Sequence, residues 1–232
     1  MKPAETLEIK SLKLFKDIED KNFDHLMRGA YIQNFPAQIE LITESEPSDF
    51  LHIVVSGVVE LFATWNRRET TMATMWAGST FILAATIKDA PYLMSARTLE
   101  KSRVVLLPSQ DVRDIFKIDH AFSMSVVDEL AQCYRSVIKN AKDLKLRNSV
   151  ERLANYILRQ NWRAGSTGEF DLKVEKRLLA SYLGMTPENL SRAIKALQPY
   201  GVKINGMHVT ILDVDDLTSF AKPILSIDDP YH

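Results

Sequence analysis

Two short amphipathic helices are predicted between residues 178 and 197 by the spacing of apolar residues. The first repeats them at i, i+1, i+4 and i+5, which places one stripe on one face. The second repeats them every three or four residues. The apolar residues of the two stripes are Leu178, Leu179, Tyr182 and Leu183, followed by Leu190, Ile194 and Leu197. The stretch therefore has the pattern of a helical hairpin.

The residues between the two stripes are typical of a tight turn. Gly184 stands where a helix C-terminus needs a positive φ. Thr186 is a good N-cap, and Pro187 then falls at the first helical position, where a missing N–H leaves no bond unmade. Stripes and turn together predict a helix-turn-helix.

Polar side chains on the outer face of the second helix match what base recognition requires. A helix-turn-helix places the N-terminal residues of its second helix in the major groove. Arginine pairs with guanine, glutamate accepts from cytosine, and serine contacts several bases. We expect six residues to form a DNA-binding surface: Thr186, Glu188, Asn189, Ser191, Arg192 and Lys195. An ordinary helical hairpin with a solvated charged face has the same pattern.

The sequence around this hairpin predicts the rest of a winged helix. An amphipathic helix covers 150–158, and a strand covers 170–174. Residues 202–212 read as two strands around an Asn205-Gly206 turn. A helix-turn-helix followed by such a ribbon is a winged helix.

Residues 1–108 are mostly β in pattern. After a short helical start at 9–15, four strand-like runs are separated by turn residues, a spacing typical of a small barrel or jelly roll. The runs cover 51–55, 57–62, 72–76 and 103–107.

Residues 109–146 return to a helical period. Apolar residues step by 3, 4, 3, 4 and 3, which is the seam of a coiled coil. The seam consists of Val127, Leu130, Tyr134, Val137, Ala141 and Leu144. We expect it to form a homodimer; a single helix packed on its own barrel is the alternative. The expected divisions are thus 1–108, 109–146 and 147–232.

Composition narrows the class of protein. The chain has 232 residues, 46% hydrophobic and 25% charged, and it is expected to be globular. No apolar run approaches the roughly 20 residues that span a bilayer, and the first residues lack a signal-peptide core, so we expect a cytoplasmic protein without a membrane partner. Cys133 is the single cysteine and excludes an iron–sulfur cluster held by several cysteines of one chain. We expect it to be buried beside the seam.

Charge is unevenly distributed along the chain. Residues 147–212 hold 10 Lys/Arg and 5 Asp/Glu, or +5. The remainder holds 19 (29 − 10) and 25 (30 − 5), or −6. A basic module on an acidic body suits a protein that touches double-stranded DNA at one end.

The order of barrel, dimer helix and winged helix resembles the CRP/FNR family of transcription regulators. The stretch 50–61 in the barrel and Glu188-Asn189-Leu190-Ser191-Arg192, which fits the E-x-x-S-R pattern of FNR-type recognition helices, carry the resemblance. It implies an α+β fold with a cyclic-nucleotide-binding-like barrel. It also implies TTGAT-like half-sites read by Glu188, Ser191 and Arg192, and RNA polymerase as a partner.

The sequence departs from the family pattern at the positions that bind the effector in other members. Members that bind cyclic nucleotide carry a Gly-Glu pair for the ribose and an Arg-Ser/Thr pair for the phosphate. Here Ile82-Leu83 and Tyr92-Leu93 stand at those places. A buried phosphate without its arginine would be an uncompensated charge, so we argue against cAMP.

The pocket that these departures imply is apolar, and we expect it to contain Phe81, Leu83, Tyr92, Leu93 and Met94. It resembles the NnrR/DNR-like branch, whose members are thought to sense nitric oxide through haem. Haem needs an axial ligand. The histidines outside the DNA-binding part are His25, His52 and His120, each of which is also an ordinary surface or packing residue. Haem with NO and a small apolar ligand both stay open.

The sequence favours a regulator over an enzyme. It contains no phosphate-binding loop, nucleophile elbow or H-E-x-x-H metal motif. The remaining alternative is an effector-binding or scaffold module of the same fold that does not bind DNA sequence-specifically. Retained Glu188, Ser191 and Arg192 speak against it.

Overall fold

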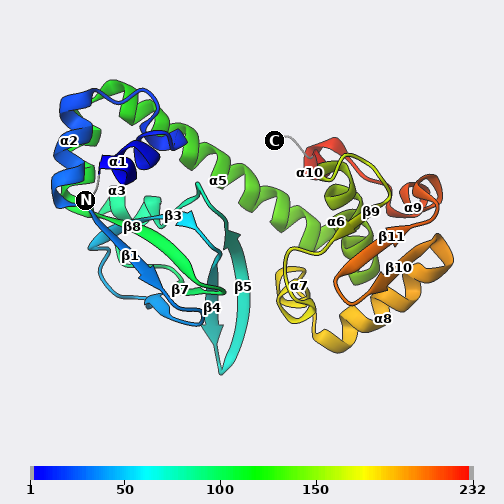
Figure 1. Cartoon of the computed structure of the whole chain (residues 1–232). Helices are drawn as coiled ribbons and strands as arrows, with labels where there is room; N and C mark the ends of the chain where they lie inside the picture. The colour runs from blue at the N-terminus through cyan, green and yellow to red at the C-terminus, as the bar shows by residue number, and fades with distance from the viewer. Residues whose placement is uncertain (1–2, 230–232) are drawn as a thin grey trace. The chain divides into compact units, whose positions relative to one another are not determined.

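The computed structural model describes residues 3–229 and divides into two compact units, residues 1–131 and 132–232. The boundary falls inside the long helix α5 (His120–Leu146), so the helix contributes to both units. Figure 1 shows the elements of each unit.

The N-terminal unit is built on two four-stranded antiparallel sheets. The first has the order β1-β8-β3-β6 and the second β2-β7-β4-β5. The strands of the first sheet are β1 (Tyr31–Phe35), β8 (Ser102–Pro108), β3 (Phe50–Ser56) and β6 (Thr80–Phe81). Those of the second are β2 (Glu40–Ile42), β7 (Ser95–Thr98), β4 (Val59–Trp65) and β5 (Arg68–Met75). The predicted barrel or jelly roll is confirmed in this arrangement.

Two apolar clusters hold this unit together. One lies between the sheets and includes Val54, Leu61 and Phe81. The other joins the first sheet to the helices and includes Phe15, Phe23 and Phe122. The helices of the N-terminal unit are α1 (Pro3–Lys10), the 3₁₀ turn η1 (Lys13–Phe15), α2 (Asp20–Gly29), α3 (Leu83–Lys88), α4 (Ser109–Ile118) and the start of α5.

The stretch 109–146, read as one helical segment in the sequence, forms two helices. The break is at Asp119, whose backbone is extended. Its carboxylate accepts hydrogen bonds from the backbone N–H of Phe122 at 2.9 Å, the backbone N–H of Glu19 at 3.0 Å and the Asn22 amide at 2.9 Å. These bonds cap α5 and tie it to α2. They hold the pKa of the Asp119 carboxyl below its usual range although burial opposes them.

The C-terminal unit contains a helix bundle and the three-stranded antiparallel sheet β10-β11-β9. Its helices are α6 (Ser149–Arg163), α7 (Lys176–Tyr182), α8 (Pro187–Leu197), the 3₁₀ turn η2 (Gln198–Tyr200), α9 (Val214–Ala221) and α10 (Leu225–Asp228). Its strands are β9 (Glu169–Asp171), β10 (Val202–Asn205) and β11 (His208–Ile211). Leu153, Ile157 and Leu197 belong to one buried cluster. The winged helix is confirmed, with a first strand shorter than predicted.

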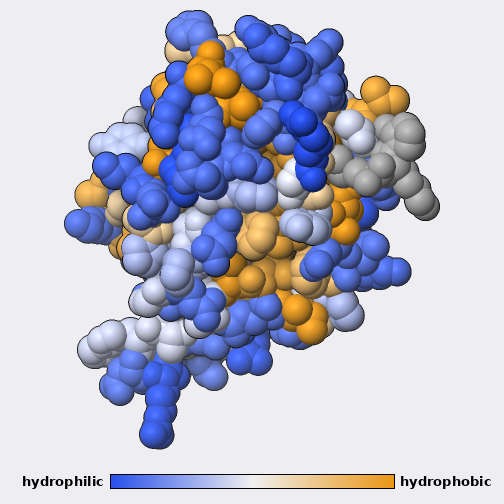
Figure 2. Space-filling view, turned by 90° about the vertical axis from the view of Figure 1, so that its left-hand side faces the viewer, coloured by the Kyte–Doolittle hydropathy of each residue, from blue (hydrophilic) through white to orange (hydrophobic). Residues whose placement is uncertain are grey.

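The surface in Figure 2 is mostly hydrophilic, with hydrophobic side chains grouped near its middle. Among the described residues, no helix is both long enough and apolar enough to cross a membrane.

Candidate nucleic-acid interface

The turn between α7 and α8 has the predicted chemistry. Gly184 follows α7 with φ at 63°, and a Cβ there would come within 2.6 Å of a Leu144 methyl group. The side chain of Thr186 accepts a hydrogen bond from the backbone N–H of Asn189 at 3.2 Å, so it caps α8, and Pro187 opens the helix. Both features direct the chain into α8 at a fixed angle.

Arg152 of α6 supports this turn and was not predicted from the sequence. Its Nε donates to the carbonyl of Leu183 at 2.8 Å, and another guanidinium nitrogen donates to the carbonyl of Arg147 at 2.7 Å. The arginine thus satisfies backbone groups at the end of α7 and at the end of α5. A contact across 31 positions leaves no periodic signal in the sequence.

Helix α8 separates its apolar and polar side chains as predicted. Leu190, Ala193 and Leu197 are buried in the core of the unit. The six polar residues expected on the DNA-binding surface all lie on the exposed side: Thr186, Glu188, Asn189, Ser191, Arg192 and Lys195. The Ser191 hydroxyl donates to the carbonyl of Pro187 at 3.0 Å, which leaves its oxygen as an acceptor.

The start of α8 favours a charged Glu188. Hydrogen bonds from its own backbone N–H and from the Thr186 side chain lower the pKa of this carboxyl, and the nearby Arg192 adds to the effect. The N-terminal end of a helix favours negative charge for the same reason. Glu188 is therefore a carboxylate at neutral pH, the form that accepts a hydrogen bond.

The wing lies beside this helix in the chain and is a regular hairpin. Strands β10 and β11 pair from Val202 with Ile211 to Asn205 with His208. The turn between them consists of Gly206, with φ at 60°, and Met207, so it lies one residue later than the predicted Asn205-Gly206 turn, because Asn205 ends β10. His208 and Asp171 pair across β11 and β9, with 2.9 Å between imidazole and carboxylate.

The apolar seam of α5 reaches the surface of the chain. Tyr134 is 68% exposed and Val137 is 57% exposed, and Val127 and Leu144 are also exposed. Leu130 is half-buried against the helical core of the N-terminal unit, and Ala141 is half-buried. Cys133, expected to be buried beside the seam, is exposed, because this stretch of α5 carries no cover in the single chain.

The expected effector residues do not form one group. Phe81, Tyr92 and Met94 share the cluster between the sheets, whereas Leu83 belongs to the helical core. Leu93 is 81% exposed, so its expected place in an interior pocket is wrong. The segment before β7 turns its side chain outward while the neighbouring Tyr92 points inward, and apolar character alone did not distinguish the two.

His52 in β3 is buried rather than pointing out of the barrel. It is 3% exposed, and its ring stacks on Phe81 with 5.1 Å between the centroids. Its Nδ1 has no hydrogen-bond partner among the described residues. Burial lowers the pKa of His52 to about 4, although a backbone hydrogen bond at Phe50 opposes the shift. His25 and His120 are exposed.

A second polar feature of the N-terminal unit was missed in the sequence. Glu60 in β4 is buried and accepts from Thr71 at 2.6 Å and from Arg97 at 2.8 Å. Arg97 also pairs with Glu69 at 3.0 Å and lies over the ring of Phe62. These residues adjoin a cavity of about 460 Å³, lined by Gln38, Glu40, Thr43, Glu44, Phe62, Thr64, Glu69, Ser95 and Arg97.

Family models match both units of the fold. Residues 32–119 match the cyclic nucleotide-binding domain, and residues 151–220 match the Crp-like helix-turn-helix domain. The chain belongs to the CRP/FNR family of transcription regulators. The regulator therefore binds DNA through the helix-turn-helix of its C-terminal unit.

Relatives of this CRP/FNR regulator align along most of its length. It is 24% identical over 215 residues to the "CRP-like cAMP-activated global transcriptional regulator" of Mycobacterium tuberculosis, covering 90% of this chain and 96% of the relative.

Solved structures at lower identity show the same fold. FixK2 from Bradyrhizobium japonicum has a TM-score of 0.69 at 22% identity over 82% of this chain and 96% of its own. The c-di-GMP responsive regulator CLP of Xanthomonas campestris has a TM-score of 0.68 at 17% identity over 83% and 99%.

Among residues 3–229, no cluster of three or more His, Cys, Asp or Glu side chains is placed to hold a metal ion.

Proposed function

We propose that this regulator binds an inverted repeat of TTGAT-N4-ATCAA type through α8. The observation that carries the proposal is the sorting of that helix: Glu188, Ser191 and Arg192 are exposed on one side while Leu190 and Leu197 are buried on the other. Arg192 donates to guanine, and the Glu188 carboxylate accepts from a cytosine amine. Lys195, further along the same side, contacts phosphate.

A dimer presents two copies of this surface to the two half-sites. The exposed side chains of Tyr134 and Val137 supply the apolar seam that a partner helix would cover. A two-fold dimer binds an inverted repeat, because the symmetry of the protein matches that of the site.

Fluorescence anisotropy with a labelled TTGAT-N4-ATCAA duplex tests the proposal. We expect binding at least about a thousandfold tighter than to a scrambled duplex of the same composition, the lower end for sequence-specific proteins. A second scrambled duplex that keeps only one half-site should bind with intermediate affinity. Equal affinity for all three duplexes would favour the scaffold module instead.

We further propose that the effector of the barrel is not cAMP. The cavity beside β4 and β7 is lined by Glu40, Glu44 and Glu69, which repel a phosphate. Its arginine, Arg97, is already held by two carboxylates, Glu60 and Glu69. A ligand without a phosphate would not meet this repulsion.

Haem is the cofactor we propose first, with NO as the gas that it binds. Of the three candidate axial ligands, only His52 is buried, and its unpartnered Nδ1 is the kind of donor that iron takes. Haem when bound supplies the iron that takes the gas. Titrating the protein with haem should shift and sharpen the Soret band relative to that of free haem, and His52→Ala should abolish this change. A Soret band identical to that of free haem at every ratio would leave a small apolar ligand as the effector.

A further inference from the structure

The short helix α10 lies against the connection between α5 and α6. On one side, Lys142 near the end of α5 donates a hydrogen bond to the Ser226 hydroxyl of α10 at 2.8 Å. On the other side, Arg159 of α6 donates to the Asp228 carboxylate of α10 at 2.6 Å. Helix α10 therefore contacts both of the helices that meet at this connection.

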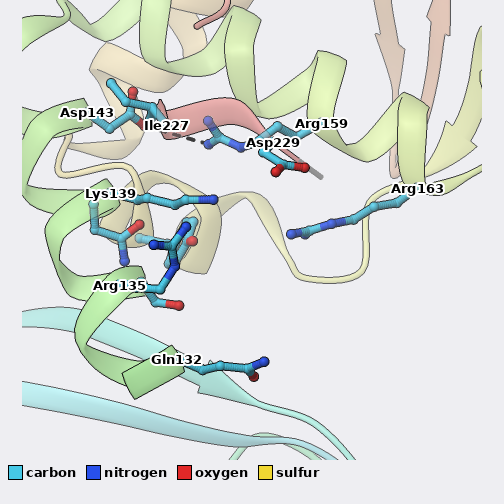
Figure 3. A pocket seen from close by; sticks show the side chains of 11 residues that line it. Gln132, Arg135, Lys139, Asp143, Arg159, Arg163, Ile227 and Asp229 are labelled. Atoms are coloured by element: carbon cyan, nitrogen blue, oxygen red, sulfur yellow. Dashed lines mark ion pairs between the residues drawn. The ribbon is translucent and has the colours of Figure 1, made fainter. Parts of the chain in front are cut away.

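The Asp228 carboxylate bridges charged side chains that reach one another less closely without it. The Asp143–Arg159 pair, which joins α5 to α6 directly, spans 3.6 Å, longer than a hydrogen bond (Figure 3). Arg147, in the connection itself, donates two hydrogen bonds to Asp228, at 2.5 and 2.9 Å. A bidentate arginine–carboxylate pair fixes orientation as well as distance. Asp228 thus joins the connection firmly to α6.

Packing holds α10 in this position although it is near the end of the chain. Ile227 is 4% exposed and Asp228 is 2% exposed. The Asp228 carboxylate also accepts a hydrogen bond from the backbone N–H of Ile224 at 2.8 Å. Before α10, the Asn155 amide of α6 donates to the carbonyl of Ala221 at 2.8 Å. A helix of four residues is unstable alone, so these contacts keep α10 folded and docked.

The angle between α5 and α6 determines where the DNA-reading helix lies. Leu153 of α6 and Leu190 of α8 belong to one buried cluster, so α8 moves with α6. The second half of α5 carries Tyr134 and Val137 of the exposed apolar seam. In the proposed dimer the seam fixes α5, and the angle at the connection then determines the separation of the two α8 helices.

We propose that α10, through Asp228, fixes the angle between α5 and α6 and so determines the half-site spacing that the dimer accepts. The inference rests on the proposed binding of an inverted repeat. Asp228 is a positioning residue, because it acts on DNA through α6 and α8. Without its charge, Arg147 and Arg159 repel one another with Asp143 as their remaining partner in this cluster, which loosens the connection. A loose connection accepts several spacings.

Fluorescence anisotropy with TTGAT–ATCAA duplexes that have a spacer of N3, N4 or N5 tests the proposal. One base pair more or less displaces a half-site by about 3.4 Å and turns it by about 35°. Wild type should bind the N3 and N5 duplexes at least about tenfold more weakly than N4, because a rigid dimer must deform the DNA. In Asp228→Asn this spacing penalty should fall below about threefold, because the connection adjusts instead and N4 binding loses preorganisation.

A duplex with a single half-site measures whether α8 itself is intact. One α8 suffices for this duplex, so Asp228→Asn should bind it within about twofold of the wild-type affinity. An equal loss on the half-site and N4 duplexes would show a general effect on folding and would overturn the proposal. An unchanged spacing penalty would overturn it too. A wild type that binds all three spacers alike would contradict the inverted repeat, and with it any role of α10 in spacing.

Lys142→Ala is a second variant, which keeps the buried ion pairs. It removes the hydrogen bond between α5 and α10 at the surface, and alanine favours the helix, so folding should be retained. The spacing penalty should fall by about threefold, as expected for one hydrogen bond, and an unchanged penalty would speak against the proposal. Asp215→Asn, on the exposed first turn of α9, removes the same charge as Asp228→Asn and should keep the wild-type penalty.

Discussion

Recognition of the DNA sequence by α8 depends on individual side chains, and replacing each of them should change DNA binding in a different way. Arg192→Ala should weaken binding to the TTGAT-type duplex by roughly 1–3 kcal/mol and binding to random DNA much less, because a base contact is lost. Lys195→Ala should weaken both duplexes alike, because phosphate carries no sequence. Anisotropy titrations of both variants measure the difference. An equal loss on both duplexes for Arg192→Ala would contradict its role.

The lowered pKa of His52 predicts that the stability of the N-terminal unit depends on pH. Its pKa falls from 6.5 in the unfolded chain to about 4 in the fold, so the unfolded chain takes up a proton first. The stability that neutral His52 contributes is therefore complete above pH 6.5 and is lost as pH falls toward 4, by about 3 kcal/mol in total.

Urea titrations across this pH range measure the loss. His52→Phe retains a ring against Phe81 and has no titrating group, so its stability should be flatter between pH 6.5 and 4.5. His25→Phe, at an exposed position of α2, serves as the control and should keep the wild-type slope. The same steep slope in His52→Phe would show that another group causes it.

At the residue scale, the role of a side chain could be predicted from the sequence where it depends only on the position of the residue within one element. Thr186 and Gly184 were assigned correctly because caps obey local rules. Leu93 and Cys133 were misplaced because hydrophobic character says nothing about which neighbour covers a side chain. Arg152 was missed because its partners lie far away in the chain.

At the scale of elements, the seam of α5 makes a prediction about assembly. Val137→Asp would put two facing carboxylates into a dimer seam, and we expect it to give monomers in sedimentation velocity. Ser136→Asp adds the same charge at a position about 100° around the helix from Val137 and outside the seam, and it should stay dimeric. A tight dimer of Val137→Asp would show that the partner lies elsewhere.

Ion pairs join α5, α6 and α10, and removing one of their charges should lower the free energy of unfolding. The side chain of Arg147 is 8% exposed. The Asp228 carboxylate forms one ion pair with Arg147 and another with Arg159. These bonds lower the pKa of Asp228 although burial opposes them. Asp228→Asn keeps the volume but removes the charge, so unfolding by urea at pH 7 should cost about 3 kcal/mol less.

Asp215→Asn, on the exposed first turn of α9, is the control and should change stability by less than about 1 kcal/mol. The contribution of Asp228 should be present above the ordinary aspartate pKa of about 4, and it should disappear as pH falls through the lowered pKa of the native carboxyl. Asp228→Asn and wild type should therefore converge in strong acid. A constant difference at all pH values would contradict the ion-pair explanation.

Helices and hairpins with a clear period were predictable, and the short or interrupted elements were not. The four predicted strands correspond to β3, β4, β5 and β8, whereas β6 has only two residues and shows no alternation. The break at Asp119 was missed because its cap depends on Asn22, Glu19 and Phe122 together, of which two lie about a hundred positions away.

At the scale of the whole molecule, the evidence that establishes the fold does not establish the effector. Matches to the cyclic nucleotide-binding domain over 32–119 establish the architecture of the N-terminal unit. They do not establish the ligand, since a relative named as cAMP-activated and one named as c-di-GMP responsive share this fold. The ligand depends on a few side chains, and here Tyr92 and Leu93 stand where the family resemblance places an arginine and a serine.

The regulator should accordingly bind its operator with the same affinity at zero and at about 1 mM cAMP, a concentration at which even a weak complex is half formed. A phosphate in the cavity beside β4 and β7 would face Glu40, Glu44 and Glu69, and the only arginine that lines that cavity among the described residues, Arg97, is held by Glu60 and Glu69. Anisotropy of the labelled operator measures the effect. The Mycobacterium tuberculosis relative, assayed on its own operator, shows that the cAMP is active. Micromolar cAMP binding by calorimetry, together with tighter operator binding, would overturn both the alignment of Tyr92 and the apolar effector.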